Sequence, residues 1–93
     1  PRVRMGTLEV RHRKEERARE KAFALLEALR AEAEEGEVLG PAPAPVRRVK
    51  GHYVFHLLLR GSPERLARLL GLLDRRQFRL DPDPFHFVGL LED

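Results

Sequence analysis

Arginine is the residue type that gives this chain most of its chemical capacity, because 15 of its 18 basic residues are Arg. Guanidinium groups bind phosphate and carboxylate in a bidentate manner, so a preference for Arg over Lys suits contact with these anions. GC-rich coding or heat adaptation would produce the same preference for Arg. Side chains suited to catalysis are scarce, because the chain has no Cys, one Thr and one Ser. The one Ser, Ser62, stands directly before Pro63, which is the pattern of a helix N-cap. The chain has no Walker A segment, no Rossmann glycine pattern and no paired carboxylates in a plausible cleft. We therefore predict a domain that is not an enzyme and needs no cofactor.

The basic residues are unevenly distributed along the chain. Residues 38–80 carry nine Lys or Arg against two acids, for a net charge of +7, and residues 81–93 carry four acids and no Lys or Arg. Residues 11–37 carry seven basic and eight acidic side chains, so their mixed charge gives little reason to expect nucleic-acid contact there. A local basic excess is the usual footprint of a polyanion-binding surface, and the alternative is a solvated surface neutralised by the acidic tail or by another domain. The phosphate contacts that we predict are Arg47, Arg48, Lys50, Arg60, Arg65, Arg68, Arg75, Arg76 and Arg79.

The histidines are candidate metal ligands. His52 and His56 would share one face of a strand but lie four residues apart, roughly 13 Å, which is too far to chelate one ion directly. Asp81, Asp83 and His86 would be able to cluster around a cation, but alternating Asp and Pro residues are more typical of a rigid turn. We therefore predict no metal site.

The elements that must position these side chains follow from hydrophobic periodicity. An alternating segment over residues 2–10, with a change of phase at Gly6-Thr7, predicts a bulged strand. A helical period predicts an amphipathic helix over residues 14–35, and a short strand over residues 37–39 is followed by a proline-rich extended connector over residues 40–48. Alternation predicts a further strand over residues 49–60. It is followed by a helix that begins at Pro63 and by a last strand over residues 77–80.

The order of these elements is β-α-β-β-α-β within one domain over residues 1–93. This order predicts an α+β fold of the ferredoxin-like, split βαβ type, with an antiparallel sheet and two helices on one face, and with the other face left free. An RNA-recognition motif has the same topology, and Lys50-Gly51 opens the third strand as that motif requires. However, the motif needs aromatic residues where His52 and Val54 stand, so we do not favour it.

Three short motifs resemble a known family. They are Val38-Leu39-Gly40-Pro41-Ala42-Pro43-Ala44-Pro45, Gly51-His52-Tyr53-Val54-Phe55-His56-Leu57-Leu58-Leu59-Arg60 and Asp81-Pro82-Asp83-Pro84. In this order they resemble the C-terminal domain of PriA, the bacterial replication-restart helicase, also called primosomal protein N′. The family typically has V-L-G-P-x-P-A-P, then G-R-Y-R-W-Q-L-L-L-K, then D-V-D-P.

The resemblance implies a C-terminal domain of a larger multidomain protein that recognises abandoned replication forks and helps to reload the replicative helicase. In the family this domain resembles a small ribosomal-subunit protein and is implicated in binding single-stranded or branched DNA. The first Arg and the Gln of the family's central motif help to hold the acidic tail of single-stranded DNA-binding protein, and His52 and His56 stand at those positions here. The family's ATPase lobes and zinc-binding cysteines are absent from these residues.

The functional expectation is thus a non-catalytic DNA-binding module that contacts single-stranded or forked DNA mainly through phosphate. The alternative is a protein-docking domain that packs on the helicase lobes of its parent protein or binds the tail of single-stranded DNA-binding protein. The chain has no apolar run near ~18 residues and no signal-peptide pattern, so we expect a cytoplasmic protein with no membrane partner.

Overall fold

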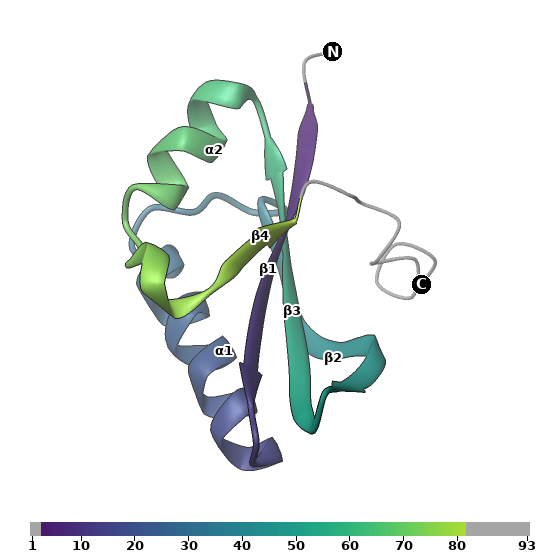
Figure 1. Cartoon of the computed structure of the whole chain (residues 1–93). Coiled ribbons are helices and arrows are strands. Elements are labelled where there is room, and N and C mark those ends of the chain that lie inside the picture. Colours follow the sequence, from purple (N-terminus) through teal and green to yellow (C-terminus); the bar gives the residue numbers. More distant parts are fainter. Residues whose placement is uncertain (1–2, 82–93) are drawn as a thin grey trace.

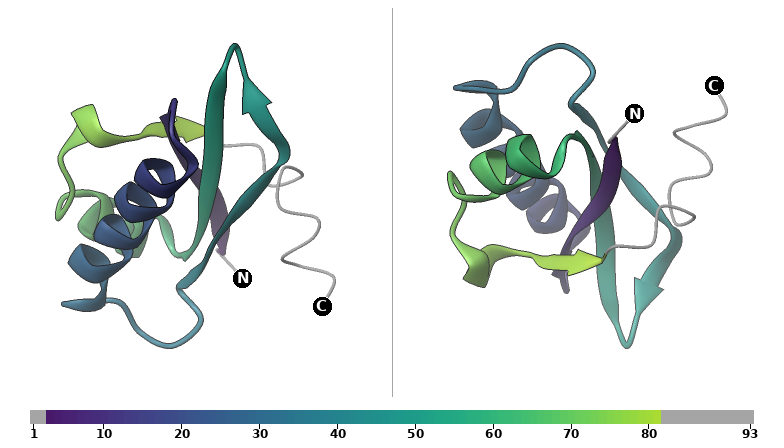
Figure 2. Two further views of the ribbon diagram at one scale, coloured as in Figure 1. Left: turned by 90° about the horizontal axis from the view of Figure 1, so that it is seen from below. Right: turned by 90° about the horizontal axis from the view of Figure 1, so that it is seen from above.

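The chain folds into one antiparallel sheet with two helices packed on the same face. The computed structural model describes residues 3–81, apart from the side chains of residues 45–49. The sheet order is β2-β3-β1-β4, and Figures 1 and 2 show α1 and α2 side by side on one face of it. This is the expected ferredoxin-like α+β architecture. Its elements are β1 (Arg4–His12), α1 (Glu15–Arg30), β2 (Val38–Val49), β3 (His52–Gly61), α2 (Pro63–Leu70), a 3-10 turn (Arg75–Gln77) and β4 (Arg79–Asp81).

The core lies between the two central strands and the helices. One face of α1 buries four small or branched apolar side chains at helical spacing. They pack against alternate residues of β1 and β3. The apolar side chains that follow the 3.6-residue period of the helix and the two-residue period of the strands therefore share one core. Leu8, Leu29, Leu57 and Leu69 are fully buried at its centre.

The start of α2 is fixed by the cap that the sequence predicts. The hydroxyl of Ser62 accepts a hydrogen bond from the backbone N–H of Arg65 at 3.1 Å. Pro63 occupies the first turn, where its missing N–H and its fixed φ cost nothing. The N-terminus of α2 is therefore set by local sequence.

The predicted bulge in the first strand is wrong. β1 pairs with β3 without interruption from Arg4 opposite Gly61 to His12 opposite Tyr53. Gly6 and Thr7 are both buried within this regular pairing. The phase of the strand is therefore set by Leu8 and Val10, which face the helices.

The second strand is much longer than predicted. Residues 40–48, expected as a connector, are extended but lie within β2, which pairs with β3 on both sides of the proline segment. β2 is at the edge of the sheet, so only one of its sides forms hydrogen bonds to a neighbouring strand. Prolines at every second position all lack the N–H group on the same side of the strand, and an edge strand tolerates this where that side faces away from its partner. The register shifts between Leu39 and Ala42 and between Pro43 and Arg48 absorb the irregularity.

The first helix is shorter than the period indicated, because it ends at Arg30 rather than near Gly36. The backbone N–H groups of Glu32 and Ala33 still bond to the carbonyl of Leu29, and the chain then leaves the helix. A carboxylate of Glu37 accepts from the backbone N–H of Glu34 at 2.8 Å and holds this connection in a turn.

The sheet face away from the helices is not the open surface that we expected. Val54, His56 and Leu58 of β3 point to that face and are at most 4% exposed, and Thr7 of β1 is fully buried. The central strands therefore offer little surface on either side. Among residues 3–81, neither helix has the length and hydropathy needed to cross a membrane.

Candidate nucleic-acid interface

The predicted phosphate contacts do not form one surface. Lys50 precedes the first residue of β3, and Arg60 lies near its last residue. The eight steps from His52 to Arg60 cover about 26 Å of extended strand. Figure 1 places the turn between β2 and β3 at one end of the sheet and α2 at the other. The predicted contacts are therefore divided between the two ends of the sheet.

The arginine at the start of α2 is tied to a carboxylate. Arg65 donates from Nε and Nη2 to the two carboxylate oxygens of Glu37, each at 2.8 Å, and Nη2 also donates to the carbonyl of Glu32 at 3.0 Å. These hydrogen bonds lower the pKa of Glu37 to about 2 and raise the pKa of Arg65. The pair joins α2 to the connection between α1 and β2, so its geometry indicates a structural role.

Three more of the predicted contacts also have partners inside the fold. Nε of Arg60 donates to the carbonyl of Gly36 at 2.6 Å. Arg68 forms an ion pair with Glu32. Arg76 pairs with Asp74 at 3.0 Å, and its hydrogen bonds lower the pKa of that carboxyl.

The remaining predicted contacts are less engaged. Arg75, Arg79 and Lys50 are exposed, and Arg75 lies over the ring of Phe78 at 5.9 Å. Lys50 and Arg79 form no ion pair with any residue from 3 to 81. Arg47 and Arg48 belong to β2, but their side chains lie outside the described part of the structure.

The turn between β2 and β3 presents Lys50 at the tip of a hairpin. The φ angles of Lys50 and Gly51 are 51° and 81°, so both central residues are left-handed, as in a two-residue type I′ turn. The imidazole Nδ1 of His52 lies 3.1 Å from the carbonyl of Lys50 and closes the turn. A narrow, exposed tip of this kind carries its cation away from the core.

A second basic segment lies at the same end of the sheet. β1 ends at His12, opposite Tyr53 of β3, and α1 begins two residues after Arg13. Partial burial is the main cause that lowers the pKa of His12, and the charges of Lys21, Arg17, Lys14 and His52 lower it further. The hairpin tip and the junction of β1 with α1 thus form one site, which we call the basic end and define as residues 11–21 and 47–52.

The charges of the two ends of the sheet differ strongly. The basic end holds nine Lys or Arg against three Glu, a formal net charge of +6 with His neutral. The opposite end, residues 30–37 and 60–68, holds four Arg against five Glu, a net charge of −1. A polyanion is therefore attracted to the end that carries the hairpin tip.

Sequence reasoning missed the contribution of residues 11–21 to this site. The charge sum over residues 11–37 is −1, because the acids near the end of α1 cancel the bases near its start. The fold separates these two groups by the length of a 16-residue helix, about 24 Å. The signal that would have found them is the run Arg11-His12-Arg13-Lys14, four consecutive basic residues at a junction of strand and helix.

The two histidines expected to hold a partner's tail are in different environments. His52 is half-buried in the basic end, whereas His56 is 4% exposed and its Nε2 lies 3.4 Å from a carboxylate oxygen of Glu9. Contact of either residue with a partner stays a prediction. In the range 3–81 no group of three His, Asp or Glu side chains is arranged to hold a metal ion, and Asp83 and His86 lie outside the described residues.

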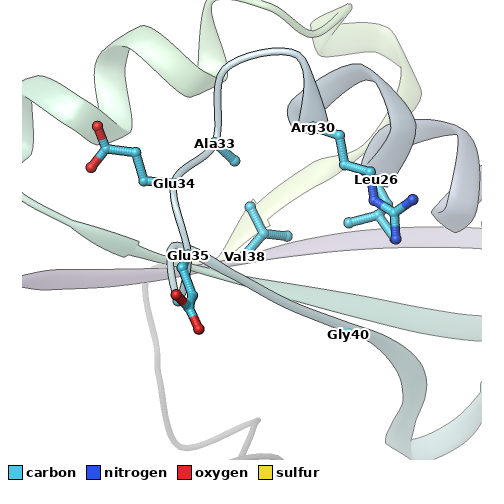
Figure 3. Close-up of a pocket in the computed structure, with 8 residues that line it drawn as sticks. Leu26, Arg30, Ala33, Glu34, Glu35, Val38 and Gly40 are labelled. Atoms are coloured by element: carbon cyan, nitrogen blue, oxygen red, sulfur yellow. The ribbon is translucent and has the colours of Figure 1, made fainter.

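A surface hollow of about 280 Å³ lies between the end of α1 and the start of β2. It is lined by the apolar Leu26 and Val38 and by the charged Arg30, Glu34 and Glu35 (Figure 3). These charges have both signs, and the two Glu side chains point away from each other (Figure 3). This hollow is therefore a poorer polyanion site than the basic end.

Comparison with known proteins identifies a family for this chain. The chain is 47% identical over 90 aligned residues to the "Probable replication restart protein PriA" of Deinococcus radiodurans, and the match covers 90% of this chain but 10% of that protein. The chain thus spans about a tenth of the length of this relative. A family model described as "Primosomal protein N C-terminal domain" matches residues 1–85. The chain therefore belongs to the family of primosomal protein N C-terminal domains.

Proposed function

We propose that this chain is a non-catalytic DNA-binding module of a replication-restart protein and that its basic end contacts the phosphates of single-stranded or forked DNA. The observation that carries the proposal is the difference in charge between the two ends of the sheet, +6 against −1. The name of the Deinococcus relative supports a role in replication restart.

The mechanism is electrostatic. Lys and Arg side chains that neutralise phosphates release condensed counterions, and this release drives binding without regard to base sequence. Base stacking contributes little, because the one large aromatic residue that is exposed among residues 3–81 is Phe23, in the middle of α1. Affinity is therefore modest, similar for unrelated sequences and strongly dependent on salt.

Exposure and internal pairing give the proposed contacts an order of preference. Lys50 is the contact that the hairpin tip presents best, and Arg47 and Arg48 lie just before this tip, in β2. Arg75 and Arg79 are exposed and accessible to a longer strand of DNA. The partners of Arg60, Arg65, Arg68 and Arg76 inside the fold suit a structural role better.

A protein-docking function is the alternative, because a basic surface also attracts acidic peptides. The acidic tail of single-stranded DNA-binding protein or an acidic surface on another domain of the parent helicase would seek the same cations. The half-buried His52 lies among them, at the position that the family resemblance assigns to tail contact. The buried His56 fits that role less well.

Fluorescence anisotropy with labelled oligonucleotides tests the proposal. We expect binding of two unrelated single strands with similar affinity at low salt, and a linear fall of log K with log salt concentration. Binding of an acidic peptide without measurable DNA binding at low salt would instead establish the docking function. A flat dependence on salt would remove the phosphate mechanism.

A further inference from the structure

His12 occupies a defined position at the centre of the basic end. It is the last residue of β1, and its Nδ1 accepts a hydrogen bond from the backbone N–H of Lys14 at 3.0 Å. A ring nitrogen that accepts cannot carry a proton, so the ring is held in the neutral form with its proton on Nε2. Nε2 then remains as the ring's single donor.

Several charged or titratable groups from neighbouring segments act on this ring. Lys14 just before α1, Arg17 and Lys21 of α1, and His52 of β3 oppose its protonation, and Tyr53 of β3 lies opposite His12 in the sheet. On β1 itself, Arg11 precedes the ring, and its charge is matched by Glu9.

Two of the side chains in this cluster are partly held. Lys21 lies over the end of β1, where its Nζ donates to the carbonyl of Arg11 at 3.4 Å. Arg17 also pairs with Glu20 at 3.7 Å on the exposed side of α1. Partial burial first, and then these cations, lower the pKa of His12 below 6.5 in the unbound protein.

We propose that His12 is a proton-linked phosphate contact, which takes up one proton when DNA binds to the basic end. This inference rests on the proposed function and adds to it a dependence of affinity on pH. The proton comes from solvent, and no bond other than N–H is made or broken in the protein.

The physical cause is the reversal of the field at the ring. A phosphate at this site neutralises the cations that oppose protonation and adds a negative charge of its own, so the charged imidazolium becomes favourable. Protonation at Nδ1 ends the hydrogen bond from Lys14, and the freed backbone N–H joins the two ring N–H groups as a donor. The protonated site therefore offers three donors where the neutral site offers one.

Linkage fixes the sign and the size of the effect. A group whose pKa rises on binding strengthens binding as the pH falls through the bound-state pKa, and the gain is complete below the unbound pKa. One histidine gives at most a tenfold change in Kd for each pH unit, and a pKa raised by one unit gives about a tenfold total gain.

The test is anisotropy with a short mixed-sequence single strand, between about pH 5.5 and pH 8 at constant ionic strength. The 93-residue chain is expected to bind more tightly as the pH falls, and His12→Gln, which keeps an acceptor for Lys14 but cannot titrate, is expected to lose most of that dependence. The matched control is His52→Gln, which removes the other histidine of the basic end and should keep the dependence. Loss of the dependence in His52→Gln, with retention in His12→Gln, would overturn the assignment to His12.

A second measurement on the unaltered chain does not depend on the variants. The ring proton resonances of His12, followed by NMR across the same pH range, should give a higher pKa with oligonucleotide than without it. An unchanged pKa in a chain that binds DNA would overturn this inference and leave the proposed function intact. A chain that binds no oligonucleotide at any pH would overturn both.

Discussion

Removal of charge from the basic end should reduce the salt dependence of DNA binding by a calculable amount. The perturbation is the triple variant Lys14→Gln, Lys21→Gln and Lys50→Asn, where Asn is chosen because it tolerates the left-handed backbone of position 50. Each phosphate contact on a single strand contributes about 0.7 to the slope of log K against log salt, so the loss of three contacts lowers the slope by about 2. Lys14 and Lys50 are exposed, so the folded state should tolerate their replacement.

A control variant with the same change in net charge separates this effect from a general loss of attraction. Arg30→Gln, Arg68→Gln and Arg76→Gln also remove three cations, but each of these side chains already pairs with a carboxylate. We expect this control to lower the slope by less than about 0.7, the value of one contact. Anisotropy titrations over a range of salt concentrations give both slopes. Equal reductions in the two variants, or no reduction in the basic-end variant, would refute the localisation of binding.

Three further predictions concern stability and are checked by urea unfolding. The pKa of Glu37 is lowered from 4.5 to about 2 in the folded protein. Its contribution to stability is therefore complete above the pKa of the unfolded chain and is lost as the pH falls from there towards 2. Glu37→Gln should flatten this dependence of stability on pH. Ser62→Ala should cost about 1 kcal/mol through loss of the helix cap, and Ser62→Asp should restore most of it. Gly40→Ala should cost about 2–3 kcal/mol, because φ is 101° and the new Cβ would lie 3.0 Å from a carbonyl oxygen of β3, whereas Gly51→Ala, which has open space, should cost about 1 kcal/mol. Equal costs at the two glycines would contradict the steric argument.

The parts of the fold that sequence predicted are those set by local interactions. The two faces of β3, the buried stripe of α1 and the cap at Ser62 each follow from periods or contacts within a few residues. The β-α-β-β-α-β order then restricts the topology to few choices, and the ferredoxin-like arrangement is the one observed.

The length of β2 depended on its place in the sheet. Prolines exclude a segment from a central strand but not from an edge strand, and sequence alone does not show which strand lies at the edge. In the structure β2 is an edge strand, so pairing with β3 continues through the proline segment to Val49.

The candidate site was only partly predictable for a similar reason. A charge sum along the chain joins residues that the fold separates, such as Lys14, just before α1, and Glu27, near its end. It also counts Arg65 as an available cation, although this side chain donates hydrogen bonds to both carboxylate oxygens of Glu37. Glu37 lies 28 residues earlier in the chain. Long-range pairing therefore decided which arginines were left for a ligand.

The location of the DNA contact is the central claim, and amide chemical-shift mapping tests it most directly. The 93-residue chain, labelled with nitrogen-15, is titrated with a short single-stranded oligonucleotide at low salt. We predict that the shifts concentrate on residues 11–21 and 47–52 and that residues 30–37 and 60–68 change little. Shifts centred on the start of α2, around Arg65 and Arg68, would contradict the account.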